Sequence, residues 1–195
     1  MTLNLDELLS VALKAAHIGA GILKDYRSKT LSFDTKGDIN NFVTEADLAS
    51  ENAVRATLRG LRPSDNISGE ELATEYNKDA QVRWSIDPLD GTVNFARGLD
   101  HFAVSVAAQH IESSDWVVGV VIAPALGDHY VAVKGEGSWR VRDGVKTTLS
   151  GPPKERESRW QRPTTNGRSR RRIRKPQFQL IAKDPGPPGP PLGGK

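Results

Sequence analysis

The 195-residue chain contains no cysteine. This absence excludes disulfide bonds, thiolate nucleophiles and zinc sites built from thiolates. Hydrophobic residues make up only 37% of the chain, which indicates that part of the sequence lies outside a compact domain. No apolar run approaches the length of a membrane span. Residues 1–7 are acidic and lack the basic and then apolar pattern of a secretion signal. We therefore expect a soluble, cytoplasmic protein with no membrane partner.

The charged residues are divided unevenly along the chain. Residues 151–195 hold 12 Lys/Arg against 3 Asp/Glu and 9 of the 12 prolines, whereas residues 1–150 hold 15 Lys/Arg against 21 Asp/Glu. The regular spacing of apolar residues also ends near residue 151. We therefore predict an acidic globular domain over 1–150 and a disordered, basic, Pro/Gly-rich tail over 151–195. The net charge of +3 is thus no evidence that the folded part binds nucleic acid.

Two amphipathic helices are predicted near the N-terminus. Asn4 and Glu7 form a capping-box pattern, and apolar residues then recur at helical spacing as far as Tyr26. Thr44 is the predicted N-cap of the second helix, after two short strands over 31–43. In the first helix, glycines at positions 19 and 21 permit close packing against a neighbour.

Four β-prone segments follow in the second half of the globular part. Turn signals separate these segments, which cover residues 102–109, 116–123, 128–134 and 138–141. Short connections between strands favour hairpins and an antiparallel sheet. The sequence therefore predicts an α+β domain in which two N-terminal helices pack on a largely antiparallel sheet.

Residues 84–95 contain the most specific chemistry. An apolar, β-prone run leads to Asp87, and Pro88 is expected to stop the strand because it cannot donate to a ladder. Asp90 follows within the same turn, so that both carboxylates can face one pocket and hold hard cations, which prefer oxygen ligands. The backbone amides after Asp90 can hold an anion. Asp, Pro and Gly are also ordinary turn residues, so this pattern alone leaves both interpretations open.

Two further acidic segments lie upstream. Asp47 falls near the start of the predicted second helix, where it either stabilises the helix dipole or points into the same pocket as the later aspartates. Glu70 and Glu71 end a short strand predicted over 66–71. Because adjacent side chains on a strand point to opposite faces, only one of the two should face a given pocket. A solvated acidic turn is the alternative.

Three segments taken together resemble the inositol monophosphatase family of magnesium-dependent, lithium-sensitive phosphatases. They are residues 43–47 (VTEAD), 69–71 (GEE) and 84–95 (WSIDPLDGTVNF). Their order and separations match the family, and the resemblance covers roughly residues 4–150. It implies the first half of an αβαβα sandwich, a small phosphorylated polyol or sugar such as inositol 1-phosphate as substrate, and Mg²⁺ as cofactor. A homodimer is a further possibility, because the family is often dimeric.

The resemblance also implies a role for particular residues. The magnesium ligands would be Glu70, Asp87, the backbone carbonyl of Leu89, and Asp90. The attacking water would be oriented and activated by Asp47, Glu70 and the Thr92 hydroxyl. The substrate would be bound through Glu70, Leu89, Asp90 and the backbone amides of Gly91 and Thr92. Several carboxylates around two cations would neutralise phosphate charge and activate water for in-line attack.

The chain departs from the family pattern after residue 150. Family members continue into a second half with a Trp-Asp-x-Ala type segment that supplies another metal ligand, whereas here Trp160 is followed by Gln161. One hypothesis is a frameshift or an erroneous gene model, and the other is a truncated protein with a genuine basic tail. We expect exposed apolar surface on strands 102–109 and 116–123, because the second half would cover them, and hence low stability and impaired activity.

The alternative function is a non-catalytic phosphatase remnant whose basic tail binds nucleic acid. A misread frame explains the tail without any function, so nucleic acid is the less favoured partner.

Overall fold

The computed structural model describes residues 3–30 and 39–151. Seven strands form one sheet in chain order, and every neighbouring pair is antiparallel except the parallel pair β1–β2. The fold is therefore α+β, as predicted. The elements are α1 (Leu5–Thr30), α2 (Ile39–Leu61), β1 (Asn66–Ser68), β2 (Val82–Asp90), α3 (Thr92–Ala96), β3 (Ala103–His110), β4 (Trp116–Ala123), β5 (Asp128–Val133), β6 (Gly137–Arg142) and β7 (Val145–Leu149).

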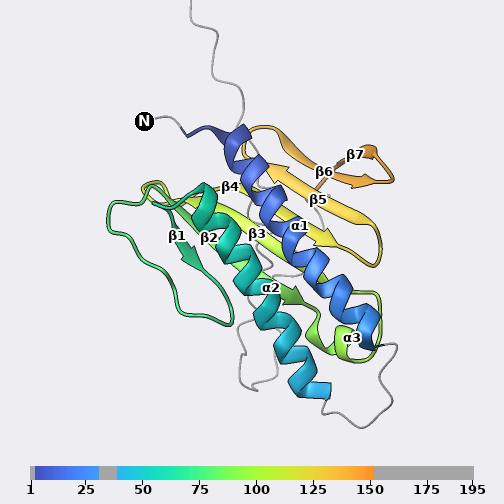
Figure 1. Ribbon diagram of the computed structural model, residues 1–195. Coiled ribbons are helices and arrows are strands. Elements are labelled where there is room, and N and C mark those ends of the chain that lie inside the picture. The colour runs from blue at the N-terminus through green and yellow to red at the C-terminus, as the bar shows by residue number, and fades with distance from the viewer. Residues whose placement is uncertain (1–2, 31–38, 152–195) are drawn as a thin grey trace, which may run out of the picture.

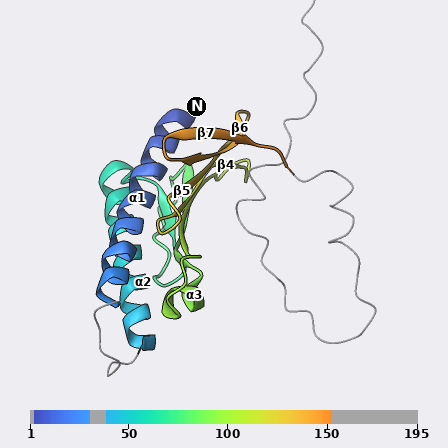
Figure 2. The same ribbon diagram turned by 90° about the vertical axis from the view of Figure 1, so that its right-hand side faces the viewer.

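The two long helices lie side by side on one face of the sheet (Figures 1 and 2). The side chain of Asn4 accepts a hydrogen bond from the amide of Glu7 at 3.1 Å, which confirms the cap of α1. Gly19 lies where α1 meets α2, and a Cβ at this position would be 2.8 Å from Cγ2 of Val54. The predicted close packing is therefore confirmed at Gly19, but it is wrong at Gly21, where a Cβ would meet nothing within 4 Å. No helix of the described residues is long and apolar enough to cross a membrane.

Helix α2 begins earlier than predicted. It starts at Ile39, so residues 39–43 are helical and the strand predicted over them is wrong. The remaining residues of that prediction, 31–38, lie outside the described residues. The early start follows from the amphipathic pattern, because Val43 and Ala46 are buried at the same helical spacing as Val54 and continue its face toward the N-terminus.

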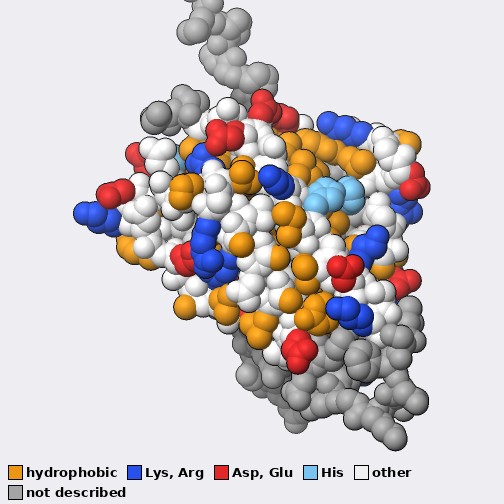
Figure 3. All heavy atoms as spheres, in the orientation of Figure 1, with side chains coloured by type: hydrophobic (Ala, Val, Ile, Leu, Met, Phe, Trp, Pro, Cys, Tyr) orange, Lys and Arg blue, Asp and Glu red, His pale blue; other side chains and the backbone are white. Residues whose placement is uncertain are grey.

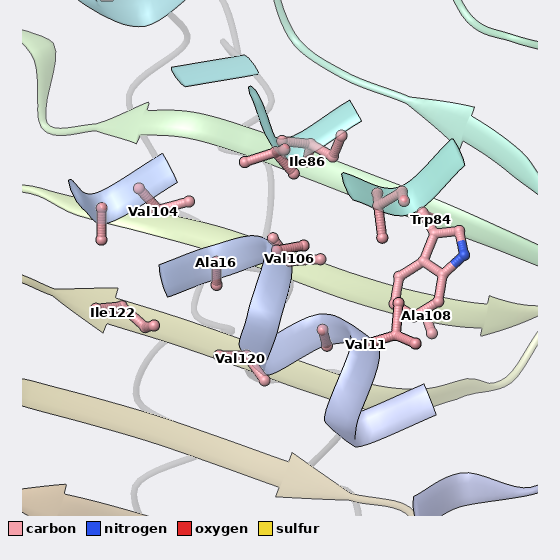
Figure 4. Packing of buried hydrophobic residues seen from close by; sticks show 14 of the residues in the cluster. Val11, Ala16, Trp84, Ile86, Val104, Val106, Ala108, Val120 and Ile122 are labelled. Atoms are coloured by element: carbon pink, nitrogen blue, oxygen red, sulfur yellow. The ribbon is translucent and has the colours of Figure 1, made fainter. Parts of the chain in front are cut away.

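The core lies between the helices and the sheet (Figure 4). Alternate residues of β2, β3 and β4 point toward the two helices, and one register row of the sheet joins Ile86, Val106, Val120 and Val131. Trp84 is fully buried in the same layer, where its indole N–H donates to a carboxylate oxygen of Asp65 at 2.9 Å. The predicted apolar alternation before Asp87 thus serves to attach β2 to the helices.

The opposite face of the sheet is not covered by the helices (Figure 2). We expected exposed apolar surface on β3 and β4, yet no residue of either strand, both of which are fully described, is in the exposed class. This expectation was wrong because the residues on that face are small: Ser85, Ala107, Gly119 and Ala132 form one register row. Larger neighbours such as Trp116 pack against this row and are half-buried.

Strand β2 does not stop at Pro88. It continues to Asp90, and its register with β3 shifts between Asp87 and Asp90. A local irregularity of this kind accommodates a residue that has no N–H to donate. Strand β1, in contrast, ends at Ser68, before the paired glutamates.

The predicted tail over 151–195 lies outside the described residues apart from Gly151. On the helix-covered face, Lys/Arg and Asp/Glu side chains are interspersed (Figure 3).

Candidate active site

Two acidic segments meet at one edge of the sheet. β1 and β2 are parallel, with Ser68 opposite Ser85, and Glu70 and Asp87 each follow two residues later. Neighbouring parallel strands run in the same direction, so the segments that follow them leave the sheet at the same edge. The sheet topology therefore places Glu70, in the loop after β1, beside the part of β2 that contains Asp87.

Helix α2 brings a third acid to this edge. Asp47 is only 8% exposed and lies two turns inside the helix, which begins at Ile39. This position rules out the alternative in which Asp47 merely stabilises a helix N-terminus. Ser50, one turn further along, donates from Oγ to the carbonyl oxygen of Pro88 at 3.0 Å in a buried position. This hydrogen bond ties α2 to the end of β2.

The electrostatics show that these acids are close neighbours. The pKa of Asp47 is raised from 3.8 to about 7, first by burial and then by nearby negative charges, of which Glu71 and Asp87 act most strongly. The pKa of Asp87 is also raised to about 7, first by burial and then by the charges of Glu70 and Asp90. The structure thus gathers the four predicted acids into one cluster. Their chemical roles remain predictions.

Glu71 belongs to this cluster as well. The charges of both Glu70 and Glu71 raise the pKa of Asp47 and of Asp87. We expected only one of the two to face the pocket because they were predicted to lie on a strand, but residues 69–72 form a loop after β1, to which the alternation of a strand does not apply.

Two buried carboxylate oxygens in the cluster have no hydrogen-bond partner. They are Oδ1 of Asp47 and Oδ1 of Asp87, which come from different elements. An unpaired polar atom in a buried position costs free energy, so buried carboxylates usually pair with donors or cations. A divalent cation satisfies such oxygens, and a set of carboxylate and carbonyl oxygens suits magnesium. The residues present therefore fit the cofactor that the sequence predicts.

Across the described residues, however, no group of three or more His, Cys, Asp or Glu side chains is arranged to hold an ion. Glu70 and Asp90 are exposed, whereas Asp47 and Asp87 are at least half-buried. Like charges repel one another at short range, and a cation is needed to bring several carboxylates to one point. The acids are therefore close enough to shift each other's pKa without sharing a coordination sphere.

The residues that follow Asp87 form a defined turn. The Thr92 hydroxyl donates to the backbone carbonyl of Leu89 at 3.1 Å, while the Leu89 side chain is buried in the core. Gly91 is the N-cap of the short helix α3 and has a φ of 93°. A Cβ there would lie 2.7 Å from the carbonyl oxygen of His101, so this turn requires glycine. The structure thus places Leu89, Gly91 and Thr92 directly beside Asp87 and Asp90.

Sequence reasoning missed three buried polar residues on α2: Ser50, Glu51 and Arg55. A signal for them was present, because they lie at helical spacing from Asp47 on the face that also carries Val54. Polar residues at core positions of an amphipathic helix need partners.

The fold and the site together define an α+β protein with a candidate cation site. That site is a cluster of acidic side chains at the edge of a sheet that two helices cover. A sequence model of the inositol monophosphatase family matches residues 4–184. This match extends past residue 150, where we expected the resemblance to end. The chain belongs to the inositol monophosphatase family.

Relatives and solved structures agree with this assignment. The Nus factor SuhB of Haemophilus influenzae is 38% identical over 135 residues, which cover 69% of this chain and 50% of the relative. The inositol-1-monophosphatase of Rhizobium meliloti is 36% identical over 150 residues, which cover 73% and 55%. The structure of Mycobacterium tuberculosis SuhB matches with a TM-score of 0.62 at 29% identity, over 78% of this chain and 54% of that one. The chain spans about half the length of the curated relatives that it matches.

Proposed function

We propose that this chain carries part of the active site of a Mg²⁺-dependent phosphomonoesterase, with inositol 1-phosphate or a similar small polyol or sugar phosphate as substrate. The observation that carries the proposal is the pair of unpartnered, buried carboxylate oxygens of Asp47 and Asp87 inside one acidic cluster. Such a cluster is unfavourable unless it binds cations. Membership of the inositol monophosphatase family supports a role for those cations in phosphate ester hydrolysis.

In the proposed site, Mg²⁺ would be held by Glu70, Asp87, the carbonyl of Leu89, and Asp90. When bound, the ion supplies Lewis acidity toward the phosphate and lowers the pKa of a bound water. Asp47 would accept the proton of that water, because its buried carboxylate has an oxygen without a hydrogen-bond partner. The Thr92 hydroxyl donates a hydrogen bond to the carbonyl of Leu89, which leaves the hydroxyl oxygen free to accept a hydrogen bond from water.

The substrate phosphate would lie beside the turn that Gly91 forms. The first N–H groups of a helix have no partner within the helix, and the amides of Gly91 and Thr92 precede and begin α3. The substrate would also be contacted by Glu70, the Leu89 carbonyl and Asp90. The two acids would reach it through the cation that they both bind. The strong negative charge of the cluster means that a phosphate enters only together with cations.

Cation binding is the direct test, because it does not require a complete active site. We expect the 195-residue chain to bind Mn²⁺, measured by electron paramagnetic resonance, and Mg²⁺ to compete for the same site. Asp87→Asn should weaken binding by about tenfold or more, since removing a ligand costs at least as much as removing its supporting partner. Asp115→Asn is the matched control, because Asp115 is exposed near the other end of β3 and pairs with Lys134. Equal affinity in both variants would contradict the proposal.

The activity is tested by release of inorganic phosphate from inositol 1-phosphate with and without Mg²⁺. Phosphate release that requires Mg²⁺ and is lost in Asp47→Asn would support the enzyme assignment. A cytoplasmic location and a homodimer remain predictions.

The second candidate function is a binding protein without catalysis. Several relatives carry the name Nus factor, which is not the name of an enzyme. In this case the basic residues 151–195 would bind nucleic acid, with an affinity that falls steeply with salt. A titration of RNA with the full chain and with a variant that lacks residues 152–195 separates the two functions.

A further inference from the structure

A buried ion pair lies beneath the loop that carries Glu70. The side chains of Glu51 and Arg55 are 0% and 1% exposed, and Arg55 Nε donates to Glu51 Oε1 at 2.7 Å. Both residues belong to α2, where they follow Asp47 on the same buried face. A buried ion pair does not in general stabilise a protein more than apolar residues of the same size. Its presence therefore calls for another explanation.

Both carboxylate oxygens of Glu51 hold the backbone of the loop. Oε2 accepts the amide of Glu71 at 2.8 Å, and Oε1 accepts the amide of Leu72 at 3.2 Å. Arg55 completes the clamp by donating from Nη2 to the carbonyl oxygen of Leu72 at 3.0 Å. The pair thus fixes the two peptide groups that directly follow Glu70.

The base of the same loop is closed separately. Ile67 and Glu75 exchange two backbone hydrogen bonds, of 3.1 and 2.8 Å. The Glu75 carboxylate accepts a hydrogen bond from Arg55 Nη1 at 2.8 Å and is also paired with Arg59. The loop is therefore closed at its base by Ile67 and Glu75 and held near its tip by Glu51.

Gly69 shows how closely the loop lies on the ion pair. A Cβ at this position would be 1.9 Å from Glu51 Oε1 and 2.9 Å from Arg55 Nη2. Only a residue without a side chain allows the backbone before Glu70 to pass over the buried pair. The glycine of the GEE segment is thus explained by contact with Glu51.

We propose that Glu51 and Arg55 are positioning residues, which hold the loop so that the exposed Glu70 side chain is directed toward Asp87. Neither residue is among the proposed ligands of the cation or the substrate. They act through the peptide groups of Glu71 and Leu72, as partners behind a ligand usually do. This inference rests on the proposed function, because it assigns to Glu70 a role in binding the cation.

The test separates positioning from stability. Glu51→Gln alone leaves Arg55 without its full partner and is expected to destabilise the protein. The double variant Glu51→Met/Arg55→Met replaces both charges with apolar side chains and so leaves no unpaired buried charge, although the two loop amides lose their acceptor. Arg59→Met is the matched control, because Arg59 is exposed and contacts only the Glu75 end of the loop.

Two measurements are made on the full chain. Hydrogen exchange in metal-free protein should be about tenfold faster or more at Glu71 and Leu72 in the double variant, and unchanged in the control, because bonds to a charged acceptor are lost. Mn²⁺ affinity, followed by electron paramagnetic resonance at a temperature at which both proteins are folded, should fall about 10- to 100-fold in the double variant. Both results together support the inference.

Unchanged exchange at Glu71 and Leu72 would overturn the inference, whatever the cation affinity. Faster exchange with wild-type affinity would also overturn it, because the loop would then be held without any effect on the site. If the wild-type chain binds no Mn²⁺ while Glu51 still protects the two amides, the proposed function fails and the positioning role fails with it. Mn²⁺ binding by the wild-type chain distinguishes this outcome from a failure of the positioning role alone, in which the wild type still binds the ion.

Discussion

Replacing Asp47 with asparagine should stabilise the metal-free protein at alkaline pH. The folded state raises the pKa of Asp47 from 3.8 to about 7, first through burial, so the folded protein binds this proton more tightly than the unfolded chain does. The associated stability is fully present below pH 3.8 and is lost as the pH rises through about 7. Above that pH the charged, buried carboxylate of Asp47 lowers the free energy of unfolding, whereas the neutral side chain of asparagine does not.

The size of the effect follows from the pKa shift. One unit corresponds to about 1.4 kcal/mol, so a rise from 3.8 to about 7 amounts to roughly 4 kcal/mol. Part of it comes from exposed neighbours such as Glu71, whose charge is screened by water and salt. The expected gain in unfolding free energy is therefore about 2 kcal/mol at pH 8. At pH 4 wild type and variant should differ little.

The assay is urea unfolding in the presence of EDTA at pH 4, 6 and 8, read by tryptophan fluorescence. The control is Asp115→Asn, because the hydrogen bond from Lys134 lowers the pKa of Asp115, so that removing its charge should not stabilise the protein at pH 8. A difference between Asp47→Asn and wild type that does not change with pH would refute the reasoning. Added Mg²⁺ should reduce this difference at pH 8, because a bound cation offsets the charge of the buried carboxylate.

Further predictions concern the cation and the glycines. Mg²⁺ should raise the melting temperature of the wild type more at pH 8 than at pH 5.5, because protons compete for Asp87, whose pKa is about 7; the shift should vanish in Asp87→Asn, and a pH-independent shift would contradict this. Gly69→Ala should lower the unfolding free energy by about 1–3 kcal/mol in urea titrations, because its Cβ would overlap Glu51. Gly91→Ala should cost about 1–3 kcal/mol because of its φ of 93°. Gly21→Ala, with nothing within 4 Å of its Cβ, should instead gain about 0.5–1 kcal/mol and is the control for both.

The fold class was predictable because its signals are local. Helical spacing after Asn4 and alternation in the later strands depend only on neighbouring residues, and short turns leave antiparallel pairing as the simplest arrangement. The errors were also local: the start of α2 and the end of β2 were each displaced by a few residues. Pro88 predicted a turn, but the strand continues through it, because the register with β3 shifts between Asp87 and Asp90.

The sequence by itself determined which acids form the candidate site and in what order they occur, because residue types and spacings are properties of the chain alone. Only the tertiary structure decided that Asp47 and Asp87 are buried with unpartnered oxygens and that Glu51 and Arg55 hold the loop of Glu70. Burial, pKa shifts and hydrogen bonds depend on what lies across space, and here α2 meets a loop some twenty residues further along the chain. No local pattern records such a contact.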